Sequence, residues 1–181
     1  MSAALWRRLD RSGHDAAALR PQGDGWLLSG LAVFEHESGP ASLAYSVETN
    51  GRWIAKGGSV RGFVGTRRVE CQMRRERGGW FLDGVEVAGL SHLFDLDFSF
   101  TPATNALALR RVSSRIGQRI DLPAAWFDLD ERRLTTLPQT YERISETAYR
   151  YAARSVGYEA VLVFCADGFV ALYPGLWGRV D

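Results

Sequence analysis

The segment SLAYSVETNGRWIAKGGS, residues 42–59, carries the pattern that decides the fold. Its first eight residues alternate between apolar and polar or small side chains, and Asn50-Gly51 then separates them from a second run. Period-two alternation indicates strands with one buried face, and Asn-Gly supplies the positive φ angles of a two-residue hairpin turn. The segment therefore predicts an antiparallel hairpin in which Val47 lies opposite Ile54.

A second dipeptide of this kind, Gly78-Gly79, follows the segment RRVECQMRRER, residues 67–77. Val69, Cys71 and Met73 form an apolar row in this segment, and the positions between them are polar. Such a pattern is typical of a half-buried strand that pairs with the next strand through a tight turn.

The third dipeptide, Asp167-Gly168, joins two runs that are apolar on both faces. A two-residue turn places Val163 opposite Leu172 and Phe164 opposite Ala171. Because both faces then carry apolar side chains, we expect each to be covered, by a second layer, by a folded-over sheet or by a ligand.

Helix signals are weak by comparison. The best candidate is LPQTYERISETAYRYAA, residues 137–153, which predicts a short helix near residues 139–145 and a strand from Thr147 onward. A sheet of many strands does not remain flat and open. The sequence therefore predicts an all-β fold: a single curved antiparallel sheet of about ten strands, a half-barrel or partly open barrel, with at most one or two short helices.

Length and charge limit the classes of protein to consider. The chain has 181 residues without a low-complexity linker, so we expect one domain spanning residues 1–181. Its net charge of +1 provides no long-range field, and no nucleic-acid partner is expected. No apolar run suggests a signal peptide or a transmembrane segment, which predicts a cytoplasmic protein. No Cys/His spacing suggests zinc, and we expect no metal and no cofactor.

The segment DLDFSFTPATNALALRR, residues 95–111, contains the most regular alternation in the chain. It predicts a strand over residues 93–101, a compact Pro-Ala-Thr-Asn turn, and a second strand that pairs back. Setting Thr101 opposite Ala106 aligns Asp97 with Arg110 in a cross-strand ion pair. We therefore assign mainly structural roles to the polar residues of this motif: Asp95, Asp97, Thr101, Pro102, Asn105 and Arg110. An alternative is that Asp95 and Asp97 form an acid/base pair.

Three segments together resemble a known family. They are DLDFSFTPATNALALRR at residues 95–111, LPQTYER at residues 137–143 and ADGFVALYPGLWGR at residues 166–179. In order and spacing they resemble the bacterial "putative glycolipid-binding" protein family, with one departure at Ala108, where proline is expected. The resemblance implies a curved antiparallel half-barrel, similar to that of bacterial lipoprotein-localisation factors, around an apolar hollow.

The first functional hypothesis is a non-enzymatic protein that binds a lipid or glycolipid in this hollow. Apolar and aromatic residues would hold the acyl part, and polar rim groups would select the headgroup. The candidate ligand-binding residues are Phe94, Phe98, Phe100, Leu109, Trp126, Tyr149, Tyr151, Leu162, Phe164, Tyr173 and Trp177. Such a sheet has a free edge, which is compatible with association into a homodimer.

Two other hypotheses remain. A small enzyme could act on an amphiphilic or sugar-containing substrate with Asp95 or Asp97 as acid/base, although no activating partner is evident. The basic residues between Arg67 and Arg77 could instead attract RNA or a protein partner, with a solvated strand face as the simpler interpretation.

Overall fold

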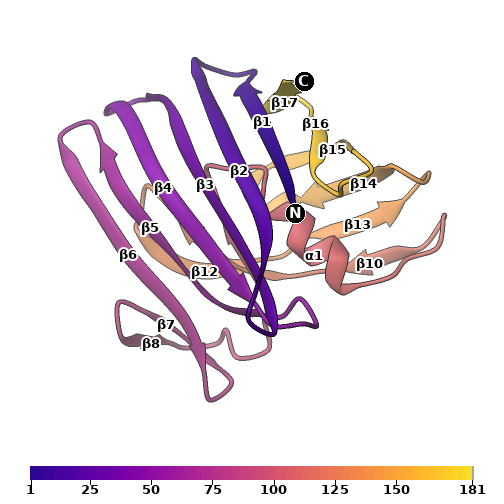
Figure 1. Ribbon diagram of the computed structural model, residues 1–181, viewed down its shortest axis with the longest axis horizontal. Coiled ribbons are helices and arrows are strands. Elements are labelled where there is room, and N and C mark those ends of the chain that lie inside the picture. Colours follow the sequence, from indigo (N-terminus) through magenta and orange to yellow (C-terminus); the bar gives the residue numbers. More distant parts are fainter. Residues whose placement is uncertain (181) are drawn as a thin grey trace.

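The computed structural model describes residues 1–180, which form a large antiparallel sheet, a small three-stranded sheet, one short α-helix and one 3-10 turn (Figure 1). The predicted all-β class, the curved antiparallel sheet that does not close and the near absence of helix are confirmed. The large sheet has fourteen strands instead of about ten, and the second sheet was not predicted.

The strands of the large sheet are β1 (Ser2–Arg8), β2 (Gly13–Gln22), β3 (Gly25–His36), β4 (Gly39–Thr49), β5 (Ala55–Val64), β6 (Arg67–Glu76), β7 (Gly79–Leu82), β8 (Val85–Val87), β10 (Arg119–Asp121), β13 (Thr140–Arg143), β14 (Ala148–Ala153), β15 (Tyr158–Phe164), β16 (Val170–Tyr173) and β17 (Trp177–Val180). The small sheet contains β9 (Asp95–Phe98), β11 (Ala124–Asp128) and β12 (Arg133–Leu137). The helix α1 spans Asn105–Arg111, and the 3-10 turn η1 spans Arg154–Val156.

The strand order of the large sheet is β10-β13-β14-β15-β16-β17-β1-β2-β3-β4-β5-β6-β7-β8. Pairing of β17 with β1 brings the C-terminal strands beside the N-terminal ones, so that β10 and β8 are the two edges. In the small sheet β11 pairs with β12 in antiparallel fashion and with β9 in parallel. Figure 1 shows the large sheet curving from the long strands β1–β6 to the shorter strands β13–β15.

The small sheet packs against the inner face of the large sheet, where side chains fill the space that a half-barrel would leave hollow. Phe98 and Phe100 stack on one another with ring centroids 5.6 Å apart, and both contact Tyr45 of β4 edge-on. All three side chains are buried, together with Trp6 and Trp80, in one continuous apolar core. Burial of this area is the main favourable term for joining the two sheets.

Two glycines permit the close packing at this face. A Cβ atom on Gly58 of β5 would lie 2.7 Å from Leu96 and 3.2 Å from Phe98, so any side chain there would push β9 away. A Cβ atom on Gly30 of β3 would lie 2.4 Å from the Tyr45 ring. Both positions therefore require the smallest residue for steric reasons.

A buried polar cluster adds a specific contact between the sheets. Asp15 of β2 is fully buried and accepts hydrogen bonds from the hydroxyls of Tyr45 and Thr101. The hydroxyl of Thr101 also accepts the backbone N–H of Ala103. The cluster therefore anchors the residues between β9 and α1 to the inner face of the large sheet, and burial raises the pKa of Asp15 to about 7.

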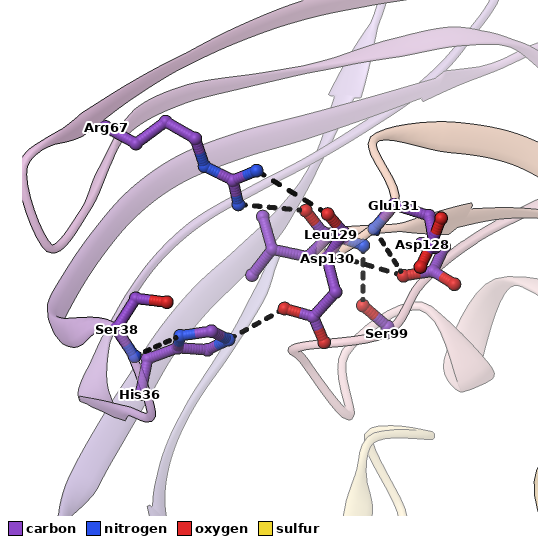
Figure 2. Close-up of polar contacts among 8 residues, drawn as sticks. All are labelled: His36, Ser38, Arg67, Ser99, Asp128, Leu129, Asp130 and Glu131. Atoms are coloured by element: carbon purple, nitrogen blue, oxygen red, sulfur yellow. Dashed lines mark hydrogen bonds and ion pairs between the residues drawn. The ribbon is translucent and has the colours of Figure 1, made fainter.

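The turn between β11 and β12 is fastened to the rim of the large sheet. Figure 2 shows His36, at the end of β3, pointing toward this turn, with its Nε2 atom 2.8 Å from a carboxylate oxygen of Asp130. The Arg67 guanidinium reaches the backbone carbonyls of Leu129 and Asp130, and the Leu129 N–H donates to the Ser99 hydroxyl at 3.2 Å. Polar contacts thus fix the far end of the small sheet.

The predicted strand over NALALRR is wrong, because these residues form α1. Alanine, leucine and arginine are strong helix formers, and the helix buries Asn105, Ala106, Leu107 and Ala108. The predicted pairing of residues 93–101 with this segment fails with it, since the neighbour of β9 is β11, with Asp97 opposite Trp126. Propensity and burial together favoured a helix that alternation alone did not reveal.

The short helix predicted near residues 139–145 is also wrong. Thr140–Arg143 is the strand β13, paired with β10 and β14, and the strand expected from Thr147 onward is β14. Tyr141 lies opposite Ile120 and Tyr151 in this sheet. Aromatic cross-strand contacts outweighed the partial helical spacing.

The three predicted hairpins exist, with changed registers. Val47 lies opposite Gly58 instead of Ile54, because the loop after β4 includes residues 51–54 and the Asn50 side chain accepts two of its N–H groups. In the next hairpin Glu76 pairs with Gly79, so the turn residues are one position earlier than predicted.

In the last hairpin Val163 lies opposite Leu172 as predicted, but a bulge places Phe164 opposite Val170. Only one of its faces is covered. Leu162 and Phe164 are buried, whereas Val161 and Leu172 are 39% and 40% exposed. The chain itself therefore covers only one of the two faces, and cover of the other face by a ligand stays a prediction.

None of the helices within residues 1–180 is long and apolar enough to cross a membrane.

The Asp15 cluster makes a pH-dependent contribution to stability. The pKa of Asp15 is about 7 in the folded chain and 3.8 for an ordinary aspartate, so between these values the folded state binds more protons than the unfolded state. The free energy of unfolding should therefore fall as the pH rises from about 4 to about 7, by at most about 1.4 kcal/mol per pH unit from this group. Asp15→Asn should reduce this dependence of the unfolding free energy on pH, which urea denaturation at a series of pH values measures.

The matched control is Asp121→Asn, at an exposed position of β10. It should leave this pH dependence unchanged. An Asp15→Asn protein whose unfolding free energy keeps the wild-type pH dependence would contradict the assignment.

Candidate functional site

A cleft of about 270 Å³ opens where the small sheet, the start of α1 and the C-terminal strands of the large sheet meet. Asp97 and Trp126 lie opposite one another in the β9–β11 pair, which directs both side chains to the same face of the small sheet. The lining residues are Asp97, Phe98, Ser99, Thr101, Asn105, Trp126, Leu137, Tyr151, Val156, Tyr158, Tyr173, Leu176 and Trp177. The cleft therefore combines aromatic side chains with several polar groups, as ligand sites commonly do.

The half-buried carboxylate of Asp97 is held on one side only. Its Oδ1 atom accepts hydrogen bonds from the N–H of Phe98, at 2.8 Å, and from the hydroxyl of Thr104. Within residues 1–180, Oδ2 accepts no hydrogen bond from the protein. Burial raises the pKa of Asp97 to about 6, so this group is ionised near neutral pH but titrates close to it.

A chain of buried hydrogen bonds supports the floor of the cleft. Asn105, the first residue of α1, donates its side-chain amide to the hydroxyl of Tyr141 at 2.8 Å. The Tyr151 hydroxyl donates to Gln139 at 2.8 Å, and Gln139 is buried beside Tyr141. Asn105 ends the predicted Pro-Ala-Thr-Asn turn, but its side-chain amide joins α1 to β13 instead of closing that turn.

Three tyrosines form an aromatic wall. The rings of Tyr158 and Tyr173 lie 4.9 Å apart, and each lies 5.8 to 6.0 Å from the ring of Tyr151. Tyr158 donates its hydroxyl to the carbonyl of Pro174, and burial raises its pKa to about 12. These groups therefore remain protonated at neutral pH and present rings and hydroxyls without charge.

The two carboxylates of the DLD motif have separate roles. Asp95 is 4% exposed, and its two carboxylate oxygens accept hydrogen bonds from Nε and Nη2 of Arg111, at 3.0 and 2.6 Å. Arg110 instead donates to the backbone carbonyl of Asp167, in the last hairpin. The predicted Asp97–Arg110 ion pair is therefore wrong, and Asp95 and Asp97 do not share one site.

The predicted ligand-binding residues divide into two groups. Five of them line the cleft: Phe98, Trp126, Tyr151, Tyr173 and Trp177. The others lie elsewhere: Phe100 in the first apolar core, Leu109, Tyr149, Leu162 and Phe164 in or against a second core under β13–β16, and Phe94 at the surface, where it is 41% exposed.

Five lining residues were not named from the sequence: Ser99, Leu137, Val156, Tyr158 and Leu176. Tyr158 is the first residue of β15, and its aromatic side chain beside an apolar run could have identified it as a candidate ligand-binding residue. The rest carry no distinguishing pattern.

Within residues 1–180 no three His, Cys, Asp or Glu side chains gather closely enough to hold a metal ion.

A larger groove, of about 660 Å³, lies over strands β17, β1, β2 and β3. It is lined mainly by alanines and by Leu5, Leu31 and Val180, which are 38% to 48% exposed. It lacks the converging hydroxyl, amide and carboxylate groups of the cleft, so the cleft is the better candidate for specific recognition.

The Arg111–Asp95 pair can be tested through stability. Arg111→Leu would leave a buried carboxylate without its partner, which should lower the free energy of unfolding by about 3 kcal/mol. The matched control, Arg150→Leu, breaks the more exposed pair with Glu142 and should cost less than about 1 kcal/mol. Urea denaturation of both variants measures the difference. Equal effects would show that burial of the Asp95 pair does not matter.

Comparisons with known proteins agree with this architecture. A family model described as "Putative glycolipid-binding" matches residues 3–179. The crystal structure of a DUF1089 family protein from Pseudomonas aeruginosa has 25% sequence identity, a TM-score of 0.79 and coverage of 92% of each chain. A search of curated proteins finds no match. Because the family model spans nearly the whole chain, this protein belongs to the "Putative glycolipid-binding" family.

Proposed function

We propose that the protein binds a glycolipid and that the cleft holds its sugar headgroup. The observation that carries the proposal is the cleft itself, where the rings of Trp126, Tyr158 and Tyr173 adjoin the carboxylate of Asp97 and the amide of Asn105. A sugar ring has apolar C–H faces and a rim of hydroxyls, so it matches aromatic faces placed beside hydrogen-bonding groups. The family description supports the same ligand class.

The size of the cleft indicates which part of the ligand it takes. About 270 Å³ is near the lower end of small-molecule sites, which measure roughly 300–1,000 Å³. This space suits a headgroup better than a whole lipid. Val156, which is 48% exposed, and Leu176 border the cleft and offer apolar contact where an acyl chain would leave it.

The inner face of the large sheet is a less suitable place for the acyl chain. Phe98, Phe100, Leu162 and Phe164 are at most 6% exposed and pack against other core residues. An acyl chain there would have to displace packed side chains, at a cost comparable to opening a cavity in the core.

A second candidate function is acid/base catalysis on a sugar-containing substrate. The observation that favours it is the raised pKa of Asp97, about 6, in a cleft. Asp95 cannot act as its partner while Arg111 holds it. Release of a chromophore from aryl glycosides, lost in Asp97→Asn and kept in Asp121→Asn, which lies outside the cleft, would support this function.

Replacement of Trp126 by alanine tests the glycolipid proposal. The change removes an aromatic face of the cleft, so affinity for the ligand should fall at least about tenfold, or 1.4 kcal/mol. Native mass spectrometry after incubation with a bacterial lipid extract would compare the bound fraction in the variant and the wild type, and extraction would identify the ligand.

The matched control is Trp26→Ala, which removes a partly buried tryptophan stacked on Trp53 and outside the cleft. It should retain ligand. If a folded Trp126→Ala protein retains as much ligand as the wild type, the cleft is not the binding site.

A further inference from the structure

The cleft carries an unusual distribution of charge for a lipid-headgroup site. Of its thirteen lining residues, all within residues 1–180, Asp97 alone has a side chain that is charged at neutral pH. The lining contains no lysine, arginine or histidine. Phosphate groups are recognised through arginine, lysine or clusters of backbone N–H groups, so the basic side chains that would favour phosphate are missing from this lining.

The arginines near the cleft are engaged by other acceptors. The Arg8 guanidinium lies 4.8 Å from the centre of the Trp177 ring, but it makes two hydrogen bonds of 2.8 Å to Asp10. Arg111 donates two hydrogen bonds to Asp95, which lies two residues before Asp97 in the chain. These cations therefore do not offset the charge of Asp97 by direct pairing.

The polar groups of the cleft suit a neutral polyol. The Oδ2 atom of Asp97 receives no protein donor and can accept a hydroxyl hydrogen. The indole N–H groups of Trp126 and Trp177 donate to no protein acceptor within residues 1–180 and can serve the hydroxyl oxygens of a ligand. Hydroxyls act both as donors and as acceptors, so a sugar ring can satisfy both kinds of group.

We infer that the cleft selects an uncharged sugar headgroup over a phosphate-bearing one, and that the Oδ2 atom of Asp97 makes this selection by accepting a hydroxyl hydrogen bond. The inference rests on the proposed function, because it names the ligand class of the same cleft. A phosphate in this position would place two negative groups together in a partly desolvated site, which is unfavourable for binding.

The test compares two lipids that share the same diacylglycerol part and each carry a hydroxyl-rich headgroup, but only one of which contains a phosphate. Phosphatidylcholine vesicles carry equal amounts of either monoglucosyl diacylglycerol, which is uncharged, or phosphatidylglycerol, which contains a phosphate. Binding of the full chain to each vesicle is measured by co-sedimentation or surface plasmon resonance. The wild type should bind the glucosyl vesicles at least about tenfold more tightly.

The variant Asp97→Asn keeps the shape of the side chain but can place an amide donor where Oδ2 accepts. Loss of a hydrogen bond to a charged group should weaken binding to glucosyl vesicles by about 10- to 100-fold. Binding to phosphatidylglycerol vesicles should stay equal or rise, because the repulsion is removed. A merely unfolded protein would lose binding to both, and thermal unfolding checks this directly.

The outcomes separate this inference from the proposed function. Wild-type preference for the glucosyl lipid, reduced in Asp97→Asn, supports both. Equal or stronger wild-type binding to phosphatidylglycerol, abolished by Trp126→Ala, overturns the inference and leaves lipid binding in the cleft standing. If neither lipid shows binding that depends on Trp126, both the inference and the proposed function fail. If Asp97→Asn does not fold, the wild-type comparison still decides whether the cleft prefers the uncharged headgroup, and a wild type without that preference overturns the inference.

Discussion

The contact between Tyr45 and residues 95–101 is the interaction on which the rest of the structure depends. The Tyr45 ring packs edge-on against Phe98 and Phe100, and its hydroxyl donates to the buried carboxyl group of Asp15, which also binds Thr101. The curved sheet alone would expose its inner apolar face. The small sheet covers that face, and the polar cluster fixes its register against the large sheet, because a slip would leave buried polar groups without partners.

This packing also creates the cleft. Once one side of β9 is committed to the core through Leu96 and Phe98, its other side must carry Asp95 and Asp97. Neighbours then give these carboxylates different environments: Arg111 neutralises Asp95, whereas Asp97 keeps one oxygen without a protein donor beside Trp126. A structural segment thereby supplies the polar group of a candidate binding site without a separate catalytic or metal-binding motif.

Much of the fold follows from local pattern. The alternation in residues 67–77 correctly predicted the buried face of β6, since Val69, Cys71 and Met73 are all at most 3% exposed. The class of fold was predictable for the same reason, because period two and turn dipeptides recur along the chain. The segment NALALRR was not, because its alternation of alanine and leucine suits a strand and its composition suits a helix. Burial between two cores decided in favour of α1.

The sequence by itself determined an all-β chain, the buried face of β6 and a set of aromatic residues from which five line the cleft. Only the tertiary structure decided which carboxylate keeps an oxygen without a protein donor, because Asp95 and Asp97 share a face in the sequence pattern and differ in the hydrogen bonds that they accept. It also decided that the expected hollow is filled and that the cleft lies beside it. These outcomes depend on contacts between residues far apart in the chain, such as β9 with β11 and β17 with β1, which local periodicity does not encode.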